Sequence, residues 1–315
     1  MEKLLHECSI LLGMEIDHST HLSYTSAVNS YLTFCRVHEL NMEPTPETLS
    51  FYATYITSFL EPRSVNTYLS GIANELETYF PDARKNCNSL LVTRTMKGAK
   101  HRYGKVINRK LPLSVEDLGV VCDDLRSSTN HDDLLFVAQL LVGFYALLRL
   151  AELCYSDKSA LQDFTKITKR ISIEWLADTF SFWLPTHKAD SDFEGSRIIV
   201  QKATTSPDPY SHFIAYLHSR DLLFPLNPEL WLRLNGQVPT RAWFIHRLRH
   251  YFPKEVAGQS LRSGGATNLA LNGVHNDLIQ AAGRWSSDVF RAYTRKNPFF
   301  VHALLFAGRT AHDHP

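Results

Sequence analysis

Apolar residues in the first hundred positions recur at intervals of three and four, which is the period of a helix with one buried face. In the first such segment, residues 20–38, this face consists of Tyr24, Val28, Tyr31, Leu32 and Cys35. The same spacing predicts further helices over residues 45–60, 64–80 and 89–98. Because this part of the chain shows no alternation typical of strands, we expect a small all-α domain over residues 1–105.

The rest of the chain combines helical spacing with the alternation of apolar and polar residues that is typical of strands. Ser114 is suited to cap one helix, and the apolar run from Leu134 to Leu148 predicts a second helix that is buried. Alternating or apolar runs predict strands over residues 171–175, 180–184 and 197–200. Helical spacing then returns over residues 209–220, 240–251, 261–272, 275–283 and 288–294. We therefore expect a second domain over residues 111–315, mixed α+β and mainly helical, with a small three-stranded antiparallel sheet.

Length and composition limit the classes of protein to which this chain can belong. A chain of 315 residues, 44% of them hydrophobic, is long enough for two globular domains with separate cores. The five cysteines are scattered and lack Cys-x-x-Cys spacing, which argues against disulfides or a thiolate zinc site and favours a reducing compartment. The apolar run 134–148 is shorter than the roughly 20 residues of a membrane span, and the N-terminus carries acids where a signal peptide needs apolar residues. We expect neither membrane association nor secretion.

The formal net charge is only +1, so binding of nucleic acid would depend on a localised basic face. One such region exists, because no acidic residue occurs between Leu91 and Lys110. Its basic residues are Arg94, Lys97, Lys100, Arg102, Lys105, Arg109 and Lys110. They indicate either a solvated linker, which we place at residues 106–110, or a basic helix end and hinge that lie along a phosphate backbone.

A second basic segment lies in the expected helix 240–251. His246 and His250 are four residues apart and could bind a metal ion. Arg247 and Arg249 stand beside them, and no acid or cysteine is near in sequence. This composition favours a helix that faces DNA over a zinc site.

The stretch from Gln259 to Tyr293 concentrates groups that suit a phosphate. It contains the guanidinium of Arg262, the amide of Gln259, the indole of Trp285 and the phenol of Tyr293. Guanidinium groups bind phosphate oxygens in pairs, and the amide and indole add neutral donors.

A further arginine closes the apolar run 134–148. Arg149 is followed three residues later by Glu152, so a structural ion pair is one interpretation and a phosphate-binding arginine with a supporting carboxylate is the other. Lys188 lies in a polar turn between the second and third expected strands, where a lone lysine is usually just solvated.

Together these residues resemble the tyrosine recombinases, also called the phage integrase family. The segment Gln259-Ser260-Leu261-Arg262 is similar to the family's His-x-x-Arg motif. The resemblance identifies Arg149 with the first catalytic arginine, Glu152 with its supporting carboxylate and Lys188 with the hairpin lysine. It identifies Trp285 with the His-or-Trp position and Tyr293 with the nucleophile. The sequence of the C-terminal region looks closest to that of Crypton-type recombinases of fungal mobile elements.

This resemblance implies an N-terminal core-binding domain of the SAM-like class, followed by the family's catalytic domain. The implied reaction is transesterification of double-stranded DNA through a 3′-phosphotyrosyl link, without metal or nucleotide cofactor. The apolar segment 297–306 would dock into a neighbouring protomer and link a homo-tetramer on paired DNA sites. The implied location is the nucleus in a fungal host, or otherwise the cytoplasm with the nucleoid.

Two departures from the family pattern keep other functions open. Gln259 stands where histidine is usual, and an amide cannot exchange a proton as imidazole can. The spacing from Trp285 to Tyr293 is also one residue shorter than expected. One alternative is therefore a catalytically inactive DNA-binding protein derived from a recombinase. A topoisomerase IB-like enzyme that nicks and reseals DNA is the other.

Overall fold

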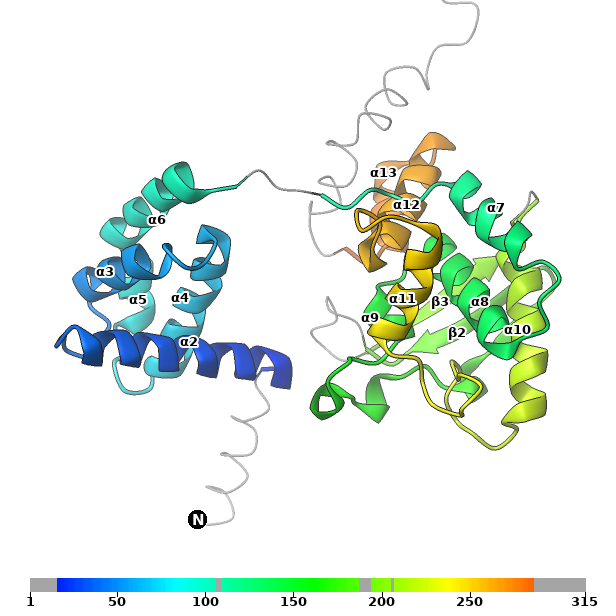
Figure 1. The fold of residues 1–315 in the computed structure, drawn as a ribbon, viewed down its shortest axis with the longest axis horizontal. Helices are drawn as coiled ribbons and strands as arrows, with labels where there is room; N and C mark the ends of the chain where they lie inside the picture. The colour runs from blue at the N-terminus through cyan, green and yellow to red at the C-terminus, as the bar shows by residue number, and fades with distance from the viewer. Residues whose placement is uncertain (1–15, 106–108, 187–193, 205–206, 286–315) are drawn as a thin grey trace, which may run out of the picture. The chain divides into compact units, whose positions relative to one another are not determined.

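The computed structural model describes residues 16–105, 109–186, 194–204 and 207–285. The chain divides into two compact units between residues 108 and 109, a position within the basic segment 106–110. We call them unit 1 and unit 2 and describe each by itself (Figure 1).

The regular secondary structure in the described residues of unit 1 is entirely α-helical. Its helices are α2 (His18–Val37), α3 (Pro46–Ile56), α4 (Pro62–Leu76), α5 (Ala83–Cys87) and α6 (Leu90–Tyr103). The Thr45 hydroxyl caps α3 by accepting from the backbone N–H of Thr48, and the Ser89 hydroxyl caps α6 in the same way. The expectation of a small all-α domain in this part of the chain is confirmed.

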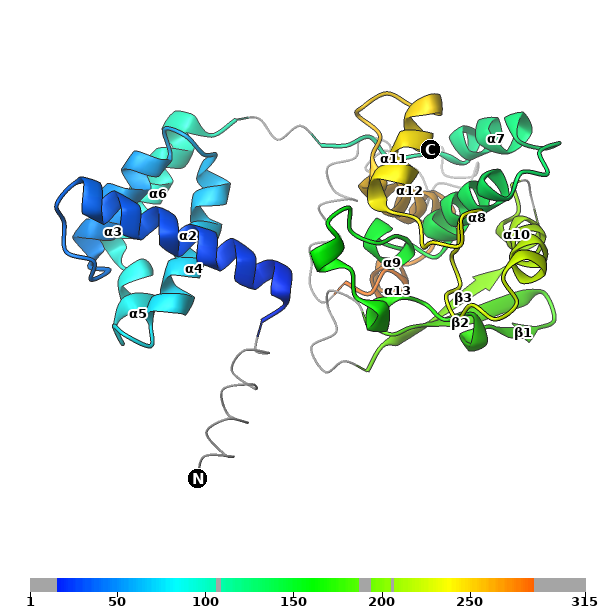
Figure 2. The ribbon, with the colours of Figure 1, turned by 60° about the horizontal axis from the view of Figure 1, so that its bottom comes forward.

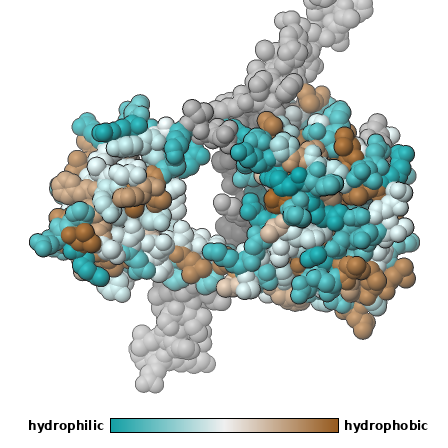
Figure 3. Space-filling model, in the orientation of Figure 1, coloured by the Kyte–Doolittle hydropathy of each residue, from teal (hydrophilic) through white to brown (hydrophobic). Residues whose placement is uncertain are grey.

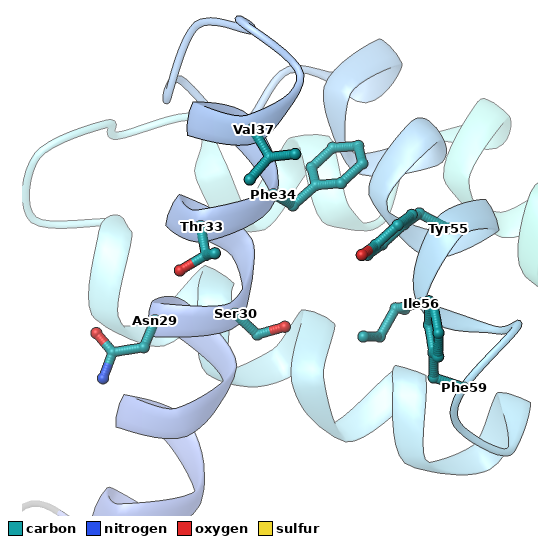
Figure 4. Close-up of a pocket in the computed structure, with 8 residues that line it drawn as sticks. All are labelled: Asn29, Ser30, Thr33, Phe34, Val37, Tyr55, Ile56 and Phe59. Atoms are coloured by element: carbon teal, nitrogen blue, oxygen red, sulfur yellow. The ribbon is translucent and has the colours of Figure 1, made fainter.

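Aromatic residues from α2 and α3 form much of the core of unit 1. Tyr31 and Tyr52 are fully buried and meet edge to face, with ring centroids 5.3 Å apart. Toward the surface the rings of Phe34, Tyr55 and Phe59 follow one another at 5.2 Å spacings. They line an open groove of about 460 Å³ between the two helices (Figure 4).

Unit 2 packs helices around and beside a small sheet. Its first elements are α7 (Val115–Asp124), α8 (His131–Tyr145), α9 (Leu150–Leu153) and the 3₁₀ turns η1 (Ser159–Leu161), η2 (Phe164–Lys166) and η3 (Arg170–Ser172). The strands are β1 (Glu174–Leu176), β2 (Thr179–Leu184) and β3 (Ser196–Gln201). The last described helices are α10 (Pro209–Leu223), α11 (Arg241–Tyr251), α12 (Gly258–Leu271) and α13 (Asn276–Ala282).

The sheet is antiparallel in the order β1-β2-β3. Its buried face contacts α10, where Phe180 of β2 stacks on Phe213 with ring centroids 4.0 Å apart. Figure 2 shows the strands at one edge of unit 2, with α10 and α8 on the same side of the sheet. This arrangement confirms the expected fold class, a mainly helical unit with a small three-stranded antiparallel sheet.

The buried helix α8 ends three residues earlier than the sequence predicted. It stops at Tyr145, and the chain reverses direction at Leu147, whose φ of +53° lies in the left-handed region. This reversal places Arg149 at the N-cap of the short helix α9 and not at the end of α8. The first strand also starts later than expected, at Glu174, because residues 170–172 form a 3₁₀ turn. The predicted helix 288–294 lies outside the described residues.

None of the helices in the described ranges is both long and apolar enough to cross a membrane.

Candidate active site

The first part of the site is the turn that follows α8. The Glu152 carboxylate folds back on Arg149 and accepts from its backbone N–H at 2.9 Å and from its Nη1 at 3.0 Å. The Glu152 side chain is only 6% exposed, whereas that of Arg149 is 25% exposed. A buried carboxylate therefore fixes a guanidinium that solvent and ligands still reach.

The second part comes from α12, which crosses the end of α8 at close range. Gly264 and Gly265 face this crossing, and a methyl group on either would overlap a backbone carbonyl, that of Leu113 or of Phe144 respectively. The close approach brings Arg262, 5% exposed, to the reversed turn. Its Nη1 donates to the Leu147 carbonyl at 2.7 Å, and its Nη2 donates to the carbonyl of Gly283.

The third part is the segment after α13. The Trp285 ring lies against Gly283 and over the guanidinium of Arg262, whose central carbon is 4.2 Å from the ring centroid. Trp285 also packs on the small apolar cluster around Leu147. Two of the positions that the sequence analysis selected in the C-terminal stretch, 262 and 285, are therefore in direct contact.

Arg284, between these residues, was not selected from the sequence. Its Nη2 donates to Glu152 Oε2 at 3.1 Å and to the Leu147 carbonyl at 3.4 Å. The shared glutamate connects it to Arg149, 135 positions earlier, and no local pattern signals such a pairing. Burial lowers the pKa of Arg284, and the charge of Glu152 acts in the opposite direction.

The cluster is strongly cationic. Arg149 and Arg284 share the carboxylate of Glu152, and Arg262 and Arg284 share the carbonyl of Leu147, so two acceptors connect three guanidinium groups. Two of its residues, Leu147 and Arg284, have φ of +53°, which is costly for residues with a Cβ and is tolerated where the surrounding structure imposes it. Such a site attracts an anion, and Arg149 is its most accessible donor.

The remaining predicted catalytic residues are placed as follows. Gln259 lies in the first turn of α12 with an exposed side chain, and that side chain makes no hydrogen bond to any residue the structure describes. Lys188 and Tyr293 lie outside the described residues. The site as described therefore brings together Arg149, Glu152 and Arg262 with Trp285.

Most predicted DNA-binding residues are exposed. Those on or just after α6 in unit 1 are Arg94, Lys97, Lys100, Arg102 and Lys105. Lys105 pairs with Glu61 at 2.8 Å, but both side chains remain largely in solvent. In Figure 3 hydrophilic residues cover the edge of unit 1 at the end of α6. Arg109 and Lys110, in unit 2, are exposed too, and Lys110 Nζ donates to the Lys254 carbonyl at 2.9 Å.

The two arginines of α11 have partners within unit 2. Arg247 forms an ion pair with Asp133 and lies over the ring of Phe136, 5.1 Å from its centroid. Arg249 Nη1 donates to the carbonyls of Pro253 and Val256, at 2.9 and 2.5 Å. These contacts hold α11 on α8 and order the loop toward α12, a structural role that the sequence analysis did not foresee for either residue.

Within the described ranges, no three His, Cys, Asp or Glu side chains gather closely enough to hold a metal ion. His246 and His250 of α11 are both exposed.

No family model and no curated protein is similar enough to this sequence to count as a match. Several solved structures are similar to this chain in fold. The integrase of the transposon Tn1549, in complex with transposon right end DNA, aligns with a TM-score of 0.58 at 14% identity, over 92% of this chain and 94% of that one.

Two other similar structures are site-specific recombinases or integrases on DNA. The XerH recombinase bound to a palindromic difH substrate aligns with a TM-score of 0.56 at 14% identity, over 83% of this chain and 71% of that one. A lambda integrase tetramer bound to a Holliday junction gives 0.57 at 13% identity, over 98% and 77%. The chain therefore has the fold of the tyrosine recombinases and integrases.

Proposed function

We propose that this protein is a site-specific DNA recombinase of the tyrosine type. The observation that carries the proposal is the cluster in which Arg149 and Arg284 share the buried carboxylate of Glu152, while Arg262 and Arg284 share the Leu147 carbonyl. Because two arginines share one carboxylate, the cluster keeps positive charge for the negative charge that accumulates when a phenolate attacks a phosphodiester. The fold supports the same reading, since similar structures include integrases bound to DNA.

In the proposed reaction the phenolate oxygen of Tyr293 attacks a DNA phosphorus. The bond from phosphorus to the 5′ oxygen breaks as the bond to tyrosine forms, and Lys188 gives the departing 5′ oxygen a proton. The 3′ end of the cut strand is then held as a phosphotyrosine. A 5′-hydroxyl from another strand reverses the step, so the energy of the original bond is retained and no nucleotide is consumed.

Arg149 contacts the non-bridging oxygens first in this scheme, because its side chain is the most exposed of the three arginines. Arg262 lies beneath it and exchanges a backbone carbonyl for a phosphate oxygen as the charge develops. Gln259 supplies only an amide donor, so the proton of Tyr293 leaves to a base other than residue 259.

We further infer the biological setting from the sequence resemblance. The protein would integrate or excise a mobile element of the Crypton type, by strand exchange within a homo-tetramer on two double-stranded DNA sites. The cluster of apolar residues at positions 297–306 would connect neighbouring protomers. A fungal host would place the protein in the nucleus.

One observation favours a second candidate function. Arg262 is 5% exposed and donates to two backbone carbonyls, and residue 259 lacks an imidazole. A protein that kept this arrangement on DNA would bind the duplex through its basic residues without cutting it. This is the inactive DNA-binding derivative.

Covalent capture separates the two functions. The purified protein is incubated with fragmented genomic DNA of the host, denatured, and the DNA that remains attached is sequenced, with Tyr293→Phe as the matched variant. Recombinase activity predicts adducts at defined sites for the wild type and none for the variant. If the protein binds DNA before denaturation but no DNA remains attached afterwards, the result would favour the DNA-binding derivative.

A further inference from the structure

Arg284 has a backbone conformation and a buried environment that are both unfavourable for an arginine. Its φ of +53° is unfavourable for a residue with a Cβ. Its side chain is only 10% exposed, and its Nε is buried with no hydrogen-bond partner in the described part of the chain. Burial of a guanidinium is unfavourable unless anions or carbonyls compensate it.

The compensation comes from groups that also hold the two predicted catalytic arginines. Arg284 Nη2 lies 3.1 Å from Glu152 Oε2, while Arg149 Nη1 lies 3.0 Å from the other carboxylate oxygen, Oε1. Arg284 Nη2 also lies 3.4 Å from the Leu147 carbonyl, which accepts from Arg262 at 2.7 Å. Arg284 therefore joins the partner of Arg149 to the partner of Arg262.

The bridge that Arg284 forms changes the charge balance around Glu152. If Glu152 had Arg149 as its only partner, the carboxylate would cancel the charge of the one arginine that a ligand reaches easily. With Arg284 on the other oxygen, two guanidinium groups share one carboxylate, so one of these two positive charges stays unbalanced. The positive charge is most accessible at Arg149, whose side chain is 25% exposed.

We propose that Arg284 is a positioning residue for the strand-cleavage reaction: it shares Glu152 with Arg149, fixes the Leu147 turn beneath Arg262, and so leaves the site with charge for a phosphate. This inference rests on the proposed function. Arg284 itself stays behind the other two arginines and acts through Glu152 and the Leu147 carbonyl.

The test compares Arg284→Met, Arg284→Lys, Glu152→Gln and the double variant Arg284→Met with Glu152→Gln. Arg170→Met is the matched control, because Arg170 also forms an ion pair with a carboxylate of unit 2, that of Asp221. For each protein, the thermal midpoint, the Kd for DNA and the single-turnover rate of adduct formation at saturating DNA are measured.

Arg284→Met is expected to slow adduct formation about 10- to 100-fold, the size expected for loss of an interaction with a charged group, and to change the Kd less than about threefold. Arg284→Lys keeps the charge without the fork and should fall between this variant and the wild type. Arg170→Met should lower the thermal midpoint without changing the rate. An Arg284→Met rate equal to that of the wild type would overturn the inference, as would a rate loss no larger than that of Arg170→Met.

The double variant covers the case in which Arg284→Met fails to fold, because it removes the buried charge of Glu152 together with that of Arg284. A neutral glutamine in place of Glu152 has no charge for Arg284 to balance, so removal of Arg284 should cost at least about tenfold less in the Glu152→Gln background than in the wild type. Equal costs in both backgrounds would show that Arg284 does not act through Glu152.

A measurement without DNA keeps this inference separate from the proposed function. Inorganic sulfate is titrated against the thermal midpoint of the wild type, Arg284→Met and Arg149→Met. The rise of the thermal midpoint in Arg149→Met measures the general stabilising effect of the salt. The additional rise in the wild type, called the excess below, measures sulfate bound at the site. If the wild type forms no adduct, the proposed function fails. The positioning role still stands if the excess is lost in Arg284→Met, and falls if Arg284→Met retains it.

Discussion

The close crossing of α12 over the end of α8 makes Gly265→Ala a sharp test of how the site is built. A Cβ at this position would lie 2.5 Å from Leu147 Cδ2 and 3.1 Å from the carbonyl carbon of Phe144, with its oxygen closer still. Backbone cannot yield as a flexible side chain can, so α12 must move away from the turn. The bond from Arg262 Nη1 to the Leu147 carbonyl, now 2.7 Å, would then be broken or strongly lengthened.

Three effects set the size of the change. Overpacking costs about 1–3 kcal/mol, and loss of a hydrogen bond from a charged donor costs about 1.5–3 kcal/mol. The gain in helix propensity from glycine to alanine returns about 1 kcal/mol. The expected net loss in the free energy of unfolding is therefore about 1.5–5 kcal/mol.

The assay can be confined to unit 2, because all five tryptophans follow residue 109. Urea unfolding followed by tryptophan fluorescence gives the free energy of unfolding of that unit. Gly119→Ala is the matched control, since Gly119 lies within α7 and a Cβ there meets nothing within 4 Å. It should stabilise unit 2 by about 0.5–1 kcal/mol. If Gly265→Ala matched this control, the close crossing would not hold Arg262, and our account of the site would be wrong.

Three smaller predictions concern the basic helix, a buried histidine and a cap. Replacing Lys97 and Lys100 of α6 by glutamine should weaken DNA binding and reduce the slope of log Kd against log salt by about 0.9 for each phosphate that α6 no longer neutralises; an unchanged slope would remove α6 from the interface. Burial lowers the pKa of His131, so the unfolded chain takes up a proton that the folded chain resists. The stability it contributes is therefore complete above about pH 6.5 and declines as the pH falls, and the urea midpoint should drop less between about pH 7.5 and 5.5 in His131→Gln than in the wild type. Ser114→Ala removes the hydroxyl that accepts from the Asp117 N–H but keeps the backbone N–H that donates to Asp117, and it should cost about 1 kcal/mol in urea unfolding, while no change would mean that this helix start is already frayed.

Local signals in the sequence were sufficient for most elements, because helix starts and strand pairing depend on neighbouring residues. Ser114 was expected to cap a helix, and its hydroxyl accepts from Asp117 N–H at 3.2 Å. Asp117, shorter than the usual glutamate, still completes the box by accepting from Ser114 N–H at 2.8 Å. The period-two runs located β2 and β3 to within a residue or two for the same reason.

The details of the site depend on partners far apart in the chain, and periodicity contains no information on these. The end of α8 was misplaced because Leu147 adopts a left-handed conformation that its residue type does not favour. Arg284 was overlooked because its carboxylate, Glu152, lies 132 positions earlier. Arg247 was assigned to DNA on composition alone, whereas the structure gives it Asp133 as a partner 114 positions away.

The central claim is that Tyr293 becomes linked to the 3′ end of a cut DNA strand, and mass spectrometry of the captured adduct tests it directly. After nuclease digestion, trypsin releases the peptide 292–295, in which Tyr293 is the only tyrosine. The account predicts this peptide with the added mass of a nucleoside 3′-phosphate, and its absence from Tyr293→Phe. An adduct on another residue, or an unmodified peptide from protein that had bound its DNA, would contradict it.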